Sequence, residues 1–579
     1  MKTIMKILGF CLVLLLGFQL VSAGEDSEII NKYSLWIGSH YTNFTDYRKR
    51  VGKYDLDNEQ GFPEFRINYL SQFSNGFLNF NGHYYDDQNI NGITKVTVAD
   101  KFRAKFQYRS LTHQQGQDLL ENISAREYHP VTSSPGDKYL THQLLDVNPD
   151  YKTHRQEILS DIDALLSKKN NIHFIIAHRS ILTDGSEQKI ASDHCFSCHL
   201  TSQKVKVRKR IHEFETGLDA ETGKFNVGYR FNYRHFESEV ADPYAYYDPA
   251  VHPISGGAGS EFGYRMIYND TTLPYSTYPR TEKMSHKVRF KGNIGKGYLS
   301  SSIAYSHARN KRVNLTTNSW VGGANYAILL NKTTRLLTKV TVIRLSADDP
   351  FIDLPTFRAG AADGNEKSFD FTRYSALDRT EAKTSAELIT RLNNKMVLSI
   401  LGGYNVIARD DYPVVNNGIT TKKLIGQAKL RYRKGLKYAS TLKYKYENIS
   451  DPFIVGKGLF EASGYKNPIL TPLVPTSNWV FYFQREGLRY QNITTMPTEV
   501  HQFEWNFTYH PTSKYSINLG VSGKYDKNGD LDSLDIKHFA IQPNININLS
   551  PNYKWAISAG YTYHYDMSRL PVTIALFDG

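Results

Sequence analysis

Two cysteines and a histidine at fixed spacing form the segment of this chain whose chemistry is easiest to recognise. Residues Cys195–His199 read Cys-Phe-Ser-Cys-His, and Cys-x-x-Cys-His is the attachment pattern of haem c. Two thiols at this spacing reach the two vinyl groups on one edge of a porphyrin. The next residue then places its imidazole over the iron. The pattern predicts one haem c, bound covalently by Cys195 and Cys198 and with His199 as the proximal iron ligand.

Other uses of the cysteine pair fit the sequence less well. The chain has three cysteines, and Cys11 lies in an N-terminal export signal, so the mature chain keeps Cys195 and Cys198. A disulfide between them would close a very short loop and stabilise little. A thioredoxin-like pair normally begins a helix in a βαβ unit, and the sequence shows no such unit. Zinc needs four ligands, with a second pair nearby.

The second axial ligand is less well determined. The histidines nearest in sequence are His173, His178, His194 and His212. We expect His194 to lie at the haem edge, and His178 to lie near the same end of its strand as the motif, so His178 is the preferred candidate. Each histidine has the alternative role of a lumen or girdle residue. A single haem makes the protein an electron carrier, and in the absence of other catalytic signatures we expect no enzymatic activity.

The N-terminus has the form of a cleaved export signal. Lys2 and Lys6 give a positive start, Ile7–Leu16 is apolar, and Val21–Ala23 is a small-residue cleavage site. We expect residues 1–23 to be removed rather than kept as a membrane anchor. Residues 24–579 contain no apolar run of the roughly 18 residues that a membrane helix needs. They are expected to form one domain with a haem-binding loop around 183–203.

Alternation of apolar and polar residues predicts long strands. From Phe225 to Arg234, every second residue is aromatic or apolar, and the residues between are polar or glycine. Similar alternation occurs in 503–509, 515–521 and 557–565. Runs of about ten residues can cross a bilayer as tilted strands, whereas strands in soluble sandwiches and propellers are usually shorter. The 40 Tyr and 30 Phe residues suit a lipid-facing surface with aromatic girdles.

The connections between the predicted strands differ in length. Short turns are expected at 220–223, 331–334, 393–395, 434–435, 511–514 and 551–553, and long polar connections at 237–285, 347–379 and 448–499. Residues 157–166 fit either a short amphipathic helix or the first arm of a hairpin turning at 168–171; the hairpin is preferred. Counting strands predicts an all-β, antiparallel transmembrane barrel of about 22 strands, within a range of roughly 18 to 26.

The charge of the chain bears on its partners. The formal net charge is +13, so a basic lumen or mouth would attract anionic groups, including haem propionates. No nucleic-acid-binding motif is present. The expected surroundings are outer-membrane lipid, in a Gram-negative bacterium.

The mature chain resembles the MtrB/PioB-type barrels of porin–cytochrome conduits in the style of its hairpins, in 548–555, 509–515 and 51–61. In that family the barrel encloses a periplasmic multihaem c-type cytochrome and lets it meet an extracellular one. The resemblance implies electron transfer across the outer membrane to an extracellular acceptor. Two features depart from the family: this chain has its own Cys-x-x-Cys-His motif, and it ends in Leu576–Gly579 rather than a terminal aromatic residue.

Two other functions are compatible with the sequence. One is a passive outer-membrane porin or uptake channel, and the other is a soluble, β-rich periplasmic protein with one haem. For the barrel, counting strands back from a periplasmic C-terminus places the turn at 220–223 in the periplasm. The strand expected at 204–216 then enters from outside, so the haem motif is predicted on the outer side of the membrane.

Overall fold

The computed structural model describes most of the mature chain. The described residues are 29–41, 61–115, 140–144, 151–194, 198–247, 266–268, 271–352, 357–359, 366–367, 371–373, 377–410, 419–452, 460–462, 496–529 and 536–570. The export signal expected at 1–23 and the last strand expected at 572–577 lie outside these residues. Among the described residues, no helix is long and apolar enough to span a membrane.

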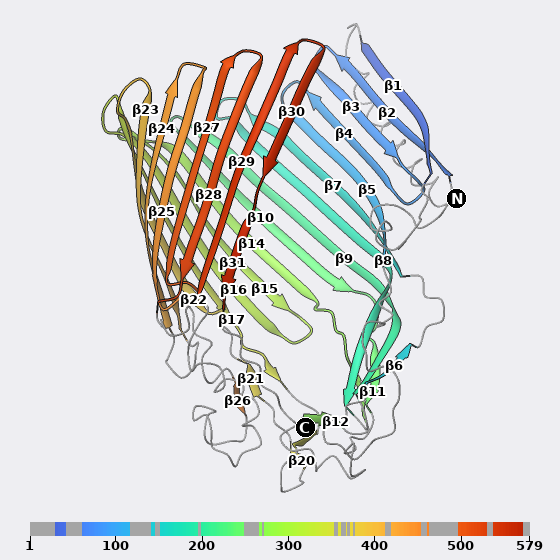
Figure 1. The fold of residues 1–579 in the computed structure, drawn as a ribbon. Coiled ribbons are helices and arrows are strands. Elements are labelled where there is room, and N and C mark those ends of the chain that lie inside the picture. The colour runs from blue at the N-terminus through green and yellow to red at the C-terminus, as the bar shows by residue number, and fades with distance from the viewer. Residues whose placement is uncertain are drawn as a thin grey trace.

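One large sheet of 23 strands makes up the fold (Figure 1). Its strands are β1 (Ile30–Tyr41), β2 (Gly61–Phe73), β3 (Gly76–Tyr84), β4 (Ile90–Val98), β5 (Phe102–Gln114), β6 (Leu140–Leu144), β7 (Lys152–Ser167), β8 (Ile172–His194), β9 (Cys198–Thr222), β10 (Phe225–Ser238), β14 (Thr281–Ile294), β15 (Gly297–Asn310), β16 (Leu315–Leu329), β17 (Thr334–Ala347), β22 (Arg379–Arg391), β23 (Met396–Arg409), β24 (Ile419–Lys434), β25 (Tyr438–Ser450), β27 (Glu499–Thr512), β28 (Tyr515–Lys527), β29 (Lys537–Asn552), β30 (Trp555–Thr562) and β31 (Tyr565–Arg569).

Apart from β6, each strand of this sheet pairs antiparallel with its neighbours along the chain. β6 pairs in parallel with β9, and β30 and β31 both pair with β29. Leaving out β6 and taking β30 with β31 as one strand, the 23 strands form a 21-strand meander, close to the predicted number. The sheet curls into a barrel shape (Figure 1), and no backbone pairing between β1 and β30 or β31 is present among the described residues.

Eight short strands lie outside the large sheet, in its long connections. They are β11 (Tyr244–Tyr247), β12 (Met266–Tyr268), β13 (Thr271–Pro274), β18 (Phe351–Ile352), β19 (Phe357–Ala359), β20 (Glu366–Lys367), β21 (Phe371–Arg373) and β26 (Phe460–Ala462).

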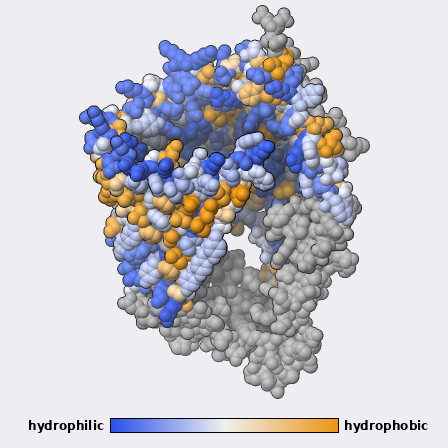
Figure 2. Space-filling model, turned by 45° about the horizontal axis from the view of Figure 1, so that its top comes forward, coloured by the Kyte–Doolittle hydropathy of each residue, from blue (hydrophilic) through white to orange (hydrophobic). Residues whose placement is uncertain are grey.

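Apolar side chains lie on the outer face of the sheet instead of in a buried core. On β10, Phe225, Val227 and Tyr229 are 38%, 41% and 40% exposed, as the predicted alternation requires. Figure 2 shows hydrophilic residues lining the hollow of the barrel and hydrophobic residues on the wall outside it. An exposed apolar surface of this extent is unfavourable in water and is typical of a protein that lies in lipid.

The two ends of the sheet carry different connections. Short turns lie at one end, among them 223–224, 330–333, 392–395, 435–437 and 513–514, as predicted. The other end carries the long connections 115–151, 239–280, 348–378 and 451–498. Residues 157–166 belong to strand β7, and the chain turns at 168–171 into β8, which confirms the predicted hairpin.

Candidate haem-attachment site

The haem motif lies at the tip of the hairpin formed by β8 and β9. His194 pairs with Cys198, and Asp193 pairs with His199, through the backbone. Cys195 lies outside the described residues, and Cys198 and His199 are described by their backbone alone. A hairpin tip is free of strand neighbours on one side, and the donor set of two thiols and an imidazole fits a haem c.

This hairpin extends well beyond its neighbours. β8 and β9 have 23 and 25 residues, whereas β7 stops pairing with β8 at Gly185 and β10 stops pairing with β9 at Lys209. Ser186–His194 therefore continues for nine residues past the last pair with β7. At the rise of an antiparallel strand this is about 30 Å. Figure 1 shows β8 and β9 reaching past the sheet toward the end that carries the long connections.

The loop expected at 183–203 is therefore wrong: the chain there is mostly paired strand, interrupted at the tip. Residues 183–194 are polar and small, apart from Ile190, and so give no apolar alternation, but their backbone groups pair with β9 along the whole segment. We call residues Ser186–His194 and Cys198–Arg208 the projecting hairpin.

The projecting hairpin packs against the connection between β10 and β14. Val205 and Val207 on β9 are buried, at 8% and 3% exposed. Gln203 donates hydrogen bonds from Nε2 to the backbone oxygen of Tyr244, at 3.3 Å, and to the hydroxyl of Tyr275, at 2.5 Å. β11 and β13, which contain or border these two tyrosines, form a small antiparallel pair. The hairpin is thus held from the side.

A cluster of charged groups around Tyr278 provides a second attachment. The Tyr278 hydroxyl donates a hydrogen bond to Glu187, and Lys209 lies 4.2 Å and Lys189 5.5 Å from the centre of the Tyr278 ring. Lys189 Nζ also lies 3.1 Å from Glu187 Oε1. Burial opposes ionisation of Glu187, but Tyr278 and the two lysines outweigh it and lower the pKa of Glu187. Burial and the Glu187 carboxylate raise the pKa of Tyr278.

Ion pairs hold the base of the hairpin, where β10 leaves the sheet. Glu239 accepts from Arg208 and Arg210, with each Nε 2.8 Å from a carboxylate oxygen. Both arginines are on β9, so Glu239 ties the start of the long connection to the strand that carries the motif.

The structure does not bring His178 to the motif. His178 pairs with Phe214, fifteen positions along β8 from Asp193, which is about 50 Å at the rise of a strand. Its ring stacks on that of His212, with centroids 6.0 Å apart. The expectation that His178 lies at the same end of its strand as the motif is wrong, because β8 continues to His194 rather than ending near Ile181.

Two other candidate histidines are also distant from the motif. His212 lies beside His178, and His173 lies at the short-turn end, where its Nδ1 is 2.6 Å from an Asp163 carboxylate oxygen. His194 alone of the four remains next to the motif, paired with Cys198.

Strand β6 brings a different histidine to the motif. In the parallel pairing with β9, Thr141 is opposite His199 and His142 is opposite Leu200. The sequence analysis did not consider His142, since it is more than fifty positions from the motif and no local pattern predicts a parallel pairing at that distance. Elsewhere in the described part of the chain, no group of three or more His, Cys, Asp or Glu side chains is arranged to hold a metal ion.

Comparisons with known proteins identify only distant similarity in fold. No family model matches the chain, and no curated protein matches it. Similar solved structures include the siderophore receptor PirA from Acinetobacter baumannii, with 9% identity, a TM-score of 0.45 and coverage of 93% of this chain and 76% of the receptor. Another is the FrpB iron transporter from Neisseria meningitidis, with 8% identity, a TM-score of 0.42 and coverage of 96% and 80%.

Proposed function

We propose that this chain is an outer-membrane β-barrel that carries one covalent haem c and serves as a component of an electron conduit across the outer membrane. The observation that carries the proposal is the Cys-x-x-Cys-His motif at the tip of a hairpin that projects beyond a lipid-compatible barrel. When bound, the haem supplies a one-electron carrier. Cys195 and Cys198 would attach it, and His199 would ligate its iron.

The location of the motif supports a position on the outer side of the membrane. Outer-membrane barrels have short periplasmic turns and longer extracellular loops. The tip of the β8–β9 hairpin lies at the same end of the sheet as the long connections, in agreement with the strand count made from the sequence. The haem then faces the exterior, where it meets an extracellular multihaem cytochrome or another acceptor, while a periplasmic multihaem cytochrome supplies electrons from within the barrel.

We propose His142 in place of His178 as the second axial ligand. The register of β6 against β9 places His142 one position from the residue opposite His199. A ligand from a separate strand reaches the haem from a direction that the attachment motif itself does not occupy. His194, which directly precedes Cys195, lies on the motif's own chain segment.

Haem staining after denaturing electrophoresis tests the core of this proposal. The mature chain should retain one haem, and the double variant Cys195→Ala/Cys198→Ala should lose it while the barrel still shifts in mobility on boiling. A mature mass equal to the bare polypeptide would show that the protein is a plain porin or channel. Recovery of a haem protein from the soluble periplasmic fraction would favour the soluble carrier.

Deletion of the gene tests the conduit role. Reduction or oxidation of an extracellular acceptor should be impaired, and that of a membrane-permeant acceptor should be unchanged. Complementation with the Cys195→Ala/Cys198→Ala variant separates the two parts of the proposal: full rescue would leave the barrel necessary and its haem dispensable. An unchanged rate in the deletion strain, with no second copy of the gene, would contradict the conduit role.

A surface epitope tests the orientation. The connection between β11 and β12 belongs to the same end of the sheet as the motif, so an epitope placed there should bind antibody on intact cells. Binding that requires permeabilisation of the outer membrane would place the motif in the periplasm.

A further inference from the structure

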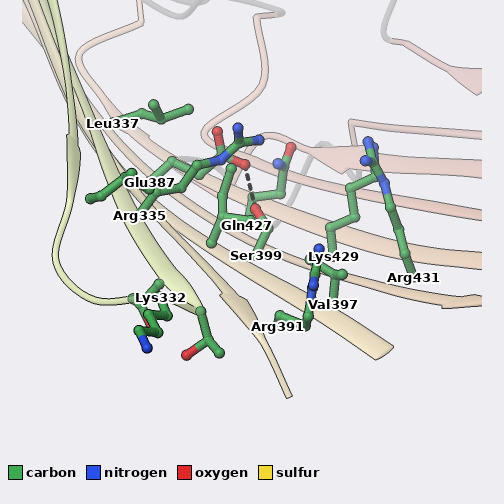
Figure 3. A pocket seen from close by; sticks show the side chains of 14 residues that line it. Lys332, Arg335, Leu337, Glu387, Arg391, Val397, Ser399, Gln427, Lys429 and Arg431 are labelled. Atoms are coloured by element: carbon green, nitrogen blue, oxygen red, sulfur yellow. Dashed lines mark hydrogen bonds between the residues drawn. The ribbon is translucent and has the colours of Figure 1, made fainter. Parts of the chain in front are cut away.

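A recess in the barrel wall at the short-turn end collects positive charge without matching negative charge. Its volume is about 580 Å³, and it is lined by residues of β17, β22, β23 and β24 and of the turn before β17. Figure 3 shows the side chains that line it. Its charged residues are five cations and one carboxylate: Lys332, Arg335, Arg391, Lys429, Arg431 and Glu387.

The register of the strands explains why these cations meet. Arg391 on β22 is opposite Val397 on β23, which is opposite Arg431 on β24. In the next row of the same face, a ladder runs from Arg335 through Ile389 and Ser399 to Lys429. Neighbouring residues on the strands, such as Leu388 and Ile400, belong to the opposite face and are 39% and 51% exposed. The cations therefore share the face turned away from this apolar surface.

None of the five cations forms an ion pair with another described residue. The single carboxylate, Glu387, instead accepts a hydrogen bond from the Ser399 hydroxyl, drawn as the dashed line in Figure 3. Other lysines on the same face are paired: Lys423 Nζ lies 2.7 Å from Glu447, and Lys443 Nζ lies 3.0 Å from Glu504. The recess thus differs from the neighbouring wall, where positive charges are neutralised within the protein.

The spacing of the cations indicates the size of the complementary ligand. Arg391 and Arg431 are separated by one strand, so their backbones lie about 10 Å apart, and those of Arg335 and Lys429 lie about 14 Å apart. One phosphate or carboxylate cannot contact all of them. An extended peptide repeats side chains on one side every 6 to 7 Å, so a run of acidic residues presents carboxylates over the required distance.

We propose that this recess binds an acidic segment of a protein partner that enters the barrel from the short-turn end. Under the proposed function this end faces the periplasm, so the inference extends that function by assigning a docking site for the enclosed partner. The binding itself depends on the barrel and not on the haem. Charged hydrogen bonds from arginine to carboxylate, strengthened by geometric fit, would hold the segment against the wall.

Fluorescence anisotropy of labelled octaglutamate, with the full-length barrel in an uncharged detergent, tests the inference. We expect saturable binding that weakens as salt is added. The variant Arg391→Gln/Arg431→Gln should weaken binding by about tenfold or more, whereas Arg391→Lys/Arg431→Lys should preserve most of it. The matched control is Lys423→Gln/Lys443→Gln, which removes the same net charge from the same wall and should change affinity less than about twofold.

Three results would overturn the inference. They are the absence of saturable binding, an equal loss in the recess variant and the matched control, and competition by pyrophosphate as effective as that by unlabelled octaglutamate, which would indicate a site for small anions. Retention of the mobility shift on boiling shows that each variant is folded. The haem-free Cys195→Ala/Cys198→Ala barrel should bind the peptide as the wild type does, so failure of the haem proposal and failure of this one are distinguishable.

Discussion

Removal of the Tyr278 hydroxyl should loosen the projecting hairpin without unfolding the barrel. In Tyr278→Phe, Glu187 loses a hydrogen bond from a neutral donor but keeps Lys189, 3.1 Å away. A hydrogen bond to a charged group contributes about 1.5 to 3 kcal/mol. Because the Glu187 side chain is 17% exposed and retains a cation, we take the lower part of this range, about 1.5 kcal/mol.

This free energy corresponds to roughly a tenfold increase in the local opening equilibrium. Tyr278→Ala should have a larger effect, because the lysine–ring contacts at 4.2 and 5.5 Å are lost as well. Such contacts contribute about 0.5 to 1 kcal/mol at partly exposed sites. The combined effect of Tyr278→Ala is therefore about 2 to 2.5 kcal/mol, or a thirtyfold to seventyfold increase in opening.

Hydrogen–deuterium exchange measured by mass spectrometry provides the assay. Peptides from 186–194 and 200–208 should exchange faster in both Tyr278 variants, and peptides from β14 to β29 should not change. The control is Tyr229→Phe, which loses a hydroxyl contact with His286 Nδ1 at 2.8 Å on the barrel wall. Equal exchange of the hairpin peptides in wild type and Tyr278→Ala would refute the role of this cluster.

Three further predictions concern the same hairpin. Since the pKa of Glu187 is lowered from 4.5 in the folded chain, its stabilising contribution is present above that value and is lost as pH falls through the lower folded pKa; exchange of 186–194, corrected for intrinsic rates, should rise on acidification in wild type but not in Glu187→Gln. His142→Ala should alter the axial-ligand bands of the haem spectrum, while His113→Ala on β5 should not; identical spectra would exclude His142 as a ligand. Gly185→Ala should lower the temperature of the boiling-dependent mobility shift, because Gly185 has φ +147° and an added Cβ would lie 2.0 Å from the Lys152 backbone oxygen; Gly322→Ala, where a Cβ meets open space, is the control.

Strands with a lipid-facing apolar side were predictable from sequence. β10 begins at Phe225, as the alternation indicates, because every second side chain there must face the exterior. β8 was predicted to end near Ile181, since the residues after Leu182 have no consistent apolar face. Their pairing is made by backbone groups, which leave no trace in side-chain periodicity.

The positions that depend on register could not be predicted in this way. His178 was assigned to the motif because β8 was predicted too short, and His142 was missed because it reaches the motif through the parallel pairing of β6 with β9. The basic recess depends on Arg335 and Arg431 lying three strands apart in the same barrel wall. A shift of one residue in any of these pairings would turn the side chains to the other face.

The length of the projecting hairpin also limits how current flows. Its tip lies about 30 Å beyond the point at which β7 and β10 stop supporting it, and the probability of electron tunnelling falls exponentially with distance. A donor confined to the level of the membrane is therefore electrically insulated from a haem at the tip. A periplasmic cytochrome that supplies this haem must protrude through the barrel mouth, and an acceptor outside the cell, even a solid too large to approach the bilayer, can discharge it by touching the tip alone.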